Sequence, residues 1–354
     1  MITLPEKLSS MTPYDPSENI YRIKLDANES FFELPLELKD EIATGIMSVD
    51  FNRYPDPSVQ AVRVLAGREF GVAAQNIAVG NGSDELLSLI INTFVPRGGK
   101  VMVVLPDFSM YQFYAEVSEF EVVQVLKNDE FELDCEQLIA RAKEEKPNVL
   151  LFSNPCNPCG KGYTHAETLK ICNALDDTLV VVDEAYMDFW DQSILDVSCM
   201  FENVLVLKTL SKAYGCAALR MGFAIGDKLL IDQLNKTRSP YNINSLSQMA
   251  AICVLEDTAW AKEQTAEIIE RKNELESAMC ELEEQYGVFH VQPTHTNFVV
   301  LRTDKSQELY EALLEASICV RCFAKHNMLR ITTGDDIENS VLIEELERIL
   351  KEGV

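Results

Sequence analysis

The segment TLVVVDEAY (Thr178–Tyr186) contains a short apolar run that ends at two carboxylates. Successive hydrophobic residues rich in valine are typical of a strand that is buried on both faces of a parallel sheet. A similar run occurs in NVLVLKTLSKAYG (Asn203–Gly215). Ligands of open α/β proteins bind at the carboxyl ends of such strands, so Asp183 and Lys212 are the first candidates for chemistry.

Similar apolar runs alternate with amphipathic stretches along the first two thirds of the chain. They occupy residues 76–80, 100–106, 121–126, 148–155 and 221–226. Turn residues bound each run, and helix-like segments such as SDELLSLIINTF (83–94) follow several of them. This pattern predicts an α/β fold with three layers, in which a mostly parallel sheet lies between helices.

The rest of the chain contains fewer strands and longer helical segments, which predicts a smaller second domain of the α+β class. At the other end, prolines at positions 5, 13 and 16 interrupt any regular element. We therefore expect an N-terminal arm of residues 1–32, a large domain of residues 33–245 and a small C-terminal domain of residues 246–354.

The chain is strongly acidic, with a net charge of −26 over 354 residues. This charge argues against a nucleic acid or an anionic membrane as a partner. No basic, apolar leader and no apolar run long enough to cross a membrane are visible in the sequence. We expect a cytoplasmic protein whose ten cysteines are reduced.

The two strand-end residues each have a functional and a structural interpretation. Lys212 can be a Schiff-base nucleophile, or it can be a solvated lysine of a loop. Asp183 can bind a metal or pair with the ring nitrogen of a cofactor, or it can cap a helix or turn.

Four further sites in the sequence are candidates for binding an anion or a ring. GNGSDELL (80–87) is a glycine-containing turn before a helix; it suits a phosphate, and Ser83 there can equally be a plain helix cap. Arg220 could bind the same phosphate. Arg330, inside the apolar strand MLRITTG, needs an anionic partner, which could be a substrate or a structural carboxylate. Phe108 could stack on a ring or belong to the core.

The segment SNPCNPCG (153–160) has two cysteines in C-x-x-C spacing. A zinc site would need a second ligand pair at suitable spacing, and none is evident. A thioredoxin-like motif would open a helix, whereas prolines interleave with these cysteines. We expect a turn that faces a ligand, and no metal site.

In this order, GNGSDELL, PDFSMY, SNPCNPCG, VVDEAY, TLSKAYG, LRMGF and LRITTG resemble the motifs of the class I/II pyridoxal-phosphate-dependent aminotransferases of fold type I. The similarity extends over nearly the whole chain and is greatest to the histidinol-phosphate aminotransferases. It implies pyridoxal 5′-phosphate as cofactor and Lys212 as the catalytic lysine that forms the Schiff base. The remaining cofactor contacts that it implies are Ser83, Asp84, Phe108, Asn157, Asp183, Tyr186, Ser211 and Arg220.

The resemblance also implies a substrate and a partner. It matches Tyr54 to a tyrosine that reaches the phosphate in the partner subunit's site, which implies a homodimer. It suggests transamination between histidinol phosphate and 2-oxoglutarate in histidine biosynthesis, with substrate contacts from Arg330, Arg321, Asn28 and Tyr14. Arg321 can equally be a surface residue paired with the many acids.

Other activities remain open at this point. The sequence after LDANES reads FFELP, where an N-P-x-G-P-like turn is expected, so the arm can cover the site differently. A threonine-phosphate decarboxylase or a broad aromatic-amino-acid aminotransferase would share the motifs. A ligand sensor of a transcription regulator is disfavoured because no basic DNA-binding segment is present.

Overall fold

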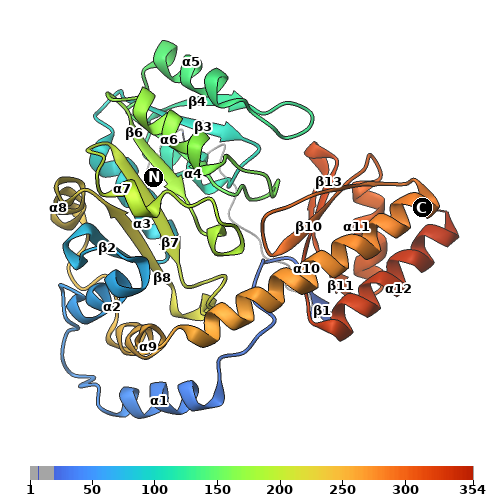
Figure 1. Cartoon of the computed structure of the whole chain (residues 1–354), viewed down its shortest axis with the longest axis horizontal. Coiled ribbons are helices and arrows are strands. Elements are labelled where there is room, and N and C mark those ends of the chain that lie inside the picture. Colours follow the sequence, from blue (N-terminus) through green and yellow to red (C-terminus); the bar gives the residue numbers. More distant parts are fainter. Residues whose placement is uncertain (1–6, 8–19, 354) are drawn as a thin grey trace, which may run out of the picture.

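A computed structural model of the chain describes Lys7 and residues 20–353, and its core is a seven-stranded sheet (Figure 1). In spatial order the strands are β2 (Ile77–Asn81), β8 (Met221–Gly226), β7 (Val204–Thr209), β6 (Leu179–Asp183), β5 (Val149–Ser153), β3 (Lys100–Leu105) and β4 (Glu121–Leu126). Strand β8 is antiparallel to both of its neighbours, and the other pairs are parallel. The predicted mostly parallel sheet is confirmed.

Helices cover both faces of this sheet, and the strand side chains alternate between the two covers. In β6, Val181 packs in the apolar cluster of helices α3 (Ser83–Phe94), α4 (Met110–Val117) and α8 (Lys228–Thr237). Its neighbours Val180 and Val182 pack instead in the cluster of the opposite face. That cluster contains residues of helices α5 (Cys135–Glu145) and α6 (His165–Ala174). The uninterrupted apolar runs of the sequence follow from this double cover.

A second, antiparallel sheet is formed by the C-terminal part of the chain. Its order is β12 (Arg321–Phe323), β13 (Met328–Thr332), β10 (Phe298–Arg302) and β9 (His290–Gln292). Leu329 and Ile331 pack in an apolar cluster with helices α10 (Ala259–Tyr286), α11 (Ser306–Glu315) and α12 (Asp336–Glu352). Since side chains alternate along a strand, Arg330 lies on the opposite face of this sheet.

Several elements lie outside the predicted ones. Helices α1 (Leu36–Met47) and α2 (Gln60–Phe70) both contact α9 (Ser245–Glu256). The two-residue strand β1 (Ile23–Lys24) pairs in parallel with β11 (Ile318–Cys319). The short helix α7 (Leu195–Ser198) precedes β7.

Helix α10 is continuous over 28 residues and runs from the neighbourhood of α9 to the second sheet (Figure 1). The division of the chain into an arm and two domains stays a prediction. Among the helices of the described residues, none combines the length and the apolar character that a membrane crossing requires.

The fold predicts that the removal of two different phenylalanine rings should have unequal effects on the free energy of unfolding. Phe152 of β5 is buried at 1% exposure, whereas Phe113 of α4 is 37% exposed. Phe152→Ala should lower the free energy of unfolding by about 3–5 kcal/mol, because it removes a ring from a closed core. Phe113→Ala is the matched control and should cost much less. Urea unfolding of both variants checks this, and equal losses would contradict the assigned burial.

Candidate active site

Asp183 ends strand β6 in the interior of the protein, where it is 4% exposed. The Tyr111 hydroxyl donates to its Oδ2 atom at 2.8 Å, and the Ala185 backbone N–H donates to Oδ1 at 3.1 Å. Burial raises the pKa of Asp183 to about 6, although both hydrogen bonds lower it. A buried carboxylate of this kind is best compensated by a cationic ligand.

Lys212 lies in the loop that follows the neighbouring strand β7. Its Nζ atom donates to the Ala27 carbonyl at 2.9 Å and lies 5.8 Å from the centre of the Tyr186 ring. The Tyr186 hydroxyl accepts a hydrogen bond of 2.8 Å from Nδ2 of Asn28, which is fully buried. Adjacent parallel strands therefore bring Lys212, Asp183 and Tyr186 to one edge of the sheet, as the sequence predicted.

The turn before helix α3 forms a cradle suited to an anion. Gly82 precedes the helix and provides no side-chain cap, so the first N–H groups of α3 are available to a ligand. Gly82 has a φ of 81°, and a Cβ atom there would lie 2.6 Å from Nη2 of Arg220. Only glycine lets this guanidinium lie so close to the turn.

One carboxylate, of Asp84, and one hydroxyl, of Ser211, complete the cradle. Arg220 Nη2 lies 3.4 Å from Oδ2 of Asp84. Burial raises the pKa of Asp84, while Arg220 and Lys212 lower it. The Ser211 hydroxyl accepts a hydrogen bond from Thr209 Oγ1 at 3.0 Å. The structure thus brings Arg220 beside the N-terminal turn of α3, next to Ser83.

Arg330 reaches from the second sheet to the turn after β5. Its Nη1 atom donates to Oδ1 of Asn157, and its Nη2 atom donates to the Asp26 carbonyl. The guanidinium carbon lies 5.5 Å from the centre of the Phe298 ring and 5.7 Å from that of Phe323. With 7% exposure, this arginine is held by two rings and two oxygens in a defined position.

Other candidates lie at the periphery. Tyr54 is 80% exposed and stacks on Tyr241 with ring centres 4.6 Å apart. Arg321 is exposed on β12, opposite Arg330 in the register of the sheet. Phe108 is partly buried, and its ring meets Tyr111 edge-on at 5.6 Å. Tyr14 lies outside the described residues.

Sequence reasoning missed Tyr111, which is fully buried and bonds Asp183 directly. No pattern in the sequence set it apart, because the carboxylate that it bonds belongs to strand β6. Asn297 was also missed; its Nδ2 atom donates to the Asn28 carbonyl at 3.1 Å and fixes that segment.

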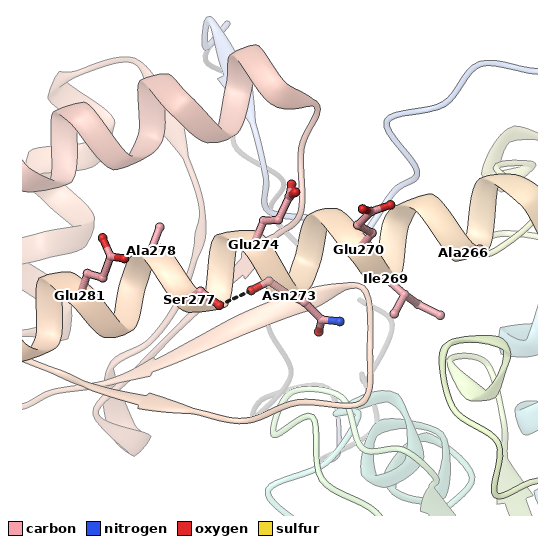
Figure 2. A pocket seen from close by; sticks show the side chains of 8 residues that line it. All are labelled: Ala266, Ile269, Glu270, Asn273, Glu274, Ser277, Ala278 and Glu281. Atoms are coloured by element: carbon pink, nitrogen blue, oxygen red, sulfur yellow. Dashed lines mark hydrogen bonds between the residues drawn. The ribbon is translucent and has the colours of Figure 1, made fainter.

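A hollow elsewhere on the protein does not coincide with these groups. It has a volume of about 640 Å³ and extends along α10. Figure 2 shows that its lining side chains all come from this helix: Ala266, Ile269, Glu270, Asn273, Glu274, Ser277, Ala278 and Glu281. Three glutamates make it a poor site for a phosphate, and no predicted site residue lines it.

A lysine, a buried carboxylate and an anion cradle at one sheet edge define a site for an anionic cofactor with a basic ring nitrogen. The profile of the family "Aminotransferase class I and II" matches residues 22–346. The chain belongs to this family and is therefore an aminotransferase that depends on pyridoxal 5′-phosphate. The residues fit this cofactor, since Asp183 suits its ring nitrogen and the α3 cradle its phosphate.

Two curated relatives are similar over almost the full length. The histidinol-phosphate aminotransferase of Clostridium novyi is 37% identical over 95% of this chain and 94% of its own. That of Clostridium kluyveri is 38% identical over 98% of both chains.

Among solved structures, the histidinol-phosphate aminotransferase of Sinorhizobium meliloti, in complex with pyridoxal 5′-phosphate, has a TM-score of 0.88. It is 24% identical and covers 99% of this chain and 98% of its own, which shows that the fold is shared.

The hydrogen bond from Tyr111 to Asp183 leads to a prediction about pH. If an ionised Asp183 binds the protonated nitrogen of the cofactor, the affinity for the cofactor should increase as pH rises through the pKa of Asp183. Tyr111→Phe removes a hydrogen bond that lowers this pKa, and should therefore move the increase upward by about one pH unit. Tyr286→Phe is the control, since its hydroxyl bonds Glu347 elsewhere. Cofactor titrations from about pH 5 to about pH 8, a range that includes the pKa of Asp183, check this prediction. An affinity curve that Tyr111→Phe leaves unshifted would contradict it.

Proposed function

We propose that this aminotransferase transfers the amino group between histidinol phosphate and 2-oxoglutarate, a step of histidine biosynthesis. The observation that carries the proposal is the full-length similarity to enzymes of that name at 37–38% identity. The buried Arg330, held beside the candidate cofactor turn, supports it because the substrates on both sides of the reaction are anionic.

The cofactor would be held by groups that already converge. Asp183 would bind its ring nitrogen, and Asn157 and Tyr186 would bind the oxygen substituent of the ring. Phe108 would stack on the ring plane. The phosphate would be bound by Ser83, the backbone N–H groups of Asp84, Ser211 and Arg220. When bound, the cofactor withdraws electrons from the carbon that carries the amino group, which makes its C–H bond acidic.

Lys212 would be the catalytic residue. Its Nζ atom would attach the cofactor, be displaced by the incoming amine, and then take the proton from the substrate's α-carbon and return it one position away. The Ala27 carbonyl and the Tyr186 ring position Nζ at the edge of the sheet. A lysine held in this way can carry the proton over a short distance without solvent.

Substrate recognition would centre on Arg330. A guanidinium binds a carboxylate or a phosphate in the same forked geometry, so one residue can serve both substrates. Asn28 follows Asp26, whose carbonyl contacts Arg330, by two residues, and its side chain holds the Tyr186 hydroxyl. Arg321 and Tyr14 are proposed as additional contacts for the phosphorylated substrate.

We also propose a homodimer, as the exposed Tyr54 suggests. Several large apolar side chains are exposed in the segments around it: Leu36, Met47, Phe51, Tyr241 and Leu246. Such a concentration is typical of a surface that another chain covers. In this arrangement Tyr54 would reach the phosphate in the partner subunit's site. The cytoplasmic location stays a prediction.

The substrate proposal is tested by two parallel incubations of the cofactor-loaded enzyme. Histidinol phosphate with 2-oxoglutarate should yield glutamate, and O-phosphothreonine alone should yield no carbon dioxide. Lys212→Ala should reduce glutamate formation by at least about 10²–10⁴-fold, because the proton carrier is lost. Carbon dioxide from phosphothreonine without glutamate from the first mixture would overturn the substrate assignment, and turnover retained by the variant would overturn the role of Lys212.

The dimer proposal is tested by mixing two inactive chains. Lys212→Ala and Tyr54→Ala chains should each have low activity, and co-refolded mixtures should regain part of it. In the mixed dimer, one site would have Lys212 from one chain and Tyr54 from the other. If Tyr54 serves the site of its own chain, no mixed site is intact, and mixing would give no gain.

A further inference from the structure

Cys156 and Cys159 belong to the turn after β5, and Lys127 contacts Cys156 there. The proposed reaction uses none of these three residues. Lys127, directly after β4, donates from Nζ to Sγ of Cys156 at 2.9 Å and to the Pro106 carbonyl at 3.0 Å. Cys159 Sγ lies 3.6 Å from the same carbonyl oxygen, and Cys156 Sγ lies 3.5 Å from it. The carboxyl ends of β3, β4 and β5 thus bring the three groups together.

The two cysteines are three residues apart in one tight turn. A hydrogen bond of 2.7 Å from the Gly160 N–H to the Cys156 carbonyl closes it. In tight turns, Cα atoms three residues apart lie within about 7 Å, and disulfides join Cα atoms about 4.4–6.8 Å apart. Gly160 has a φ of 72° and a Cβ there would lie 2.4 Å from Thr294, so the turn is held firmly in this shape.

The surroundings of Cys156 favour a thiolate. Burial acts to raise the pKa of this thiol, but hydrogen bonding with Cys159 and the Lys127 ammonium together hold it well below its usual value. Asp107 also faces the cluster; its carboxylate accepts from the Ser153 and Phe108 backbone N–H groups. By contrast, burial raises the pKa of Cys172 to about 12. Since the thiolate is the nucleophile, the two buried cysteines should differ in reactivity.

We propose that Cys156 and Cys159 form a redox-active dithiol, which peroxides convert to a disulfide. The Cys156 thiolate attacks one oxygen of hydrogen peroxide; an S–O bond forms, the O–O bond breaks, and hydroxide leaves. The hydroxide takes up the proton that the thiol had released and becomes water. The Cys159 sulfur then attacks the oxidised sulfur and loses its proton; the S–S bond forms, the S–O bond breaks and a second water leaves. The two thiols lose two electrons, and the peroxide gains them.

This oxidation would regulate the proposed reaction. Asn157 lies between the two cysteines, and its Oδ1 atom accepts from Arg330. A disulfide would take the thiolate from Lys127 and would tether the two ends of the segment that carries Asn157, which would disturb this contact. Only this consequence rests on the proposed function; the formation of the disulfide does not depend on it.

The chemistry is tested by mass spectrometry of the full-length, cofactor-loaded protein. After exposure to hydrogen peroxide, the protein is denatured, its thiols are labelled with N-ethylmaleimide without reduction, and it is digested with trypsin. The peptide of residues 144–161 holds Cys156 and Cys159 as its only cysteines. It should lose two hydrogens and take no label, while Cys172 stays labelled. Both cysteines taking label, or Cys156 stopping at a sulfinic acid, would overturn the proposal.

Variants separate the role of the lysine. Lys127→Met should slow disulfide formation by about tenfold, since the thiolate fraction falls, and Lys127→Arg should largely retain the rate. Lys170→Met is the matched control, because that lysine pairs with Glu136 on the surface. An unchanged rate in Lys127→Met would remove the lysine from the proposal. The wild-type labelling result stands even if a variant fails to fold.

Activity provides a second measurement. Glutamate formation by the wild-type enzyme should fall as the disulfide forms and recover with dithiothreitol. In Cys159→Ser, the peptide of residues 144–161 should gain oxygen on Cys156 instead of losing two hydrogens, because the disulfide cannot form. A disulfide that forms without loss of activity would confirm the dithiol and contradict its regulatory role. If the protein has no transaminase activity, the proposed function fails, but the mass of the peptide still shows whether the disulfide forms.

Discussion

Asp183 places a carboxylate at the end of a strand whose two faces are both covered by helices. Leaving such a charge uncompensated costs several kcal/mol, so the site depends on what lies opposite it. Tyr111 and a backbone N–H each satisfy one oxygen, yet burial still raises the pKa of the acid to about 6. A protonated ring nitrogen would restore the charge balance, which is why a cofactor of this kind suits the site.

The second sheet contributes to the site through Arg330, which lies on one face of strand β13. Leu329 and Ile331 anchor β13 in the helices behind it, and the alternation of the strand directs Arg330 to the other face. There the arginine contacts Asn157, which belongs to the turn after β5. Asn28 joins the same region through Tyr186. The position of Arg330, the proposed substrate contact, is therefore fixed by the apolar packing of its neighbours in the sequence.

The sequence was sufficient to predict the place of two side chains in the fold, because each follows the end of a strand. Asp183 and Lys212 close apolar runs, and the rule that ligands bind at carboxyl ends placed both at one edge. Tyr111 could not be distinguished from core tyrosines, because its function depends on a carboxylate that a different strand supplies. The Lys127–Cys156 contact joins the end of β4 to the turn after β5, and β3 separates these two strands in the sheet. The sequence alone could not predict this contact, and the interleaved prolines argued against a redox site. Helices α1 and α2 were missed because their apolar faces are short and partly exposed.

The central claim is that the lysine after β7 attaches the cofactor at the edge defined by Asp183. Reduction of the cofactor-loaded protein with borohydride fixes the pyridoxyl group to whichever lysine carries it, and peptide mass mapping then identifies that residue. The account predicts a single modified peptide, with the group on Lys212. Modification of Lys208, which is buried beside Asp188 in the preceding strand, or of several surface lysines without preference, would contradict it.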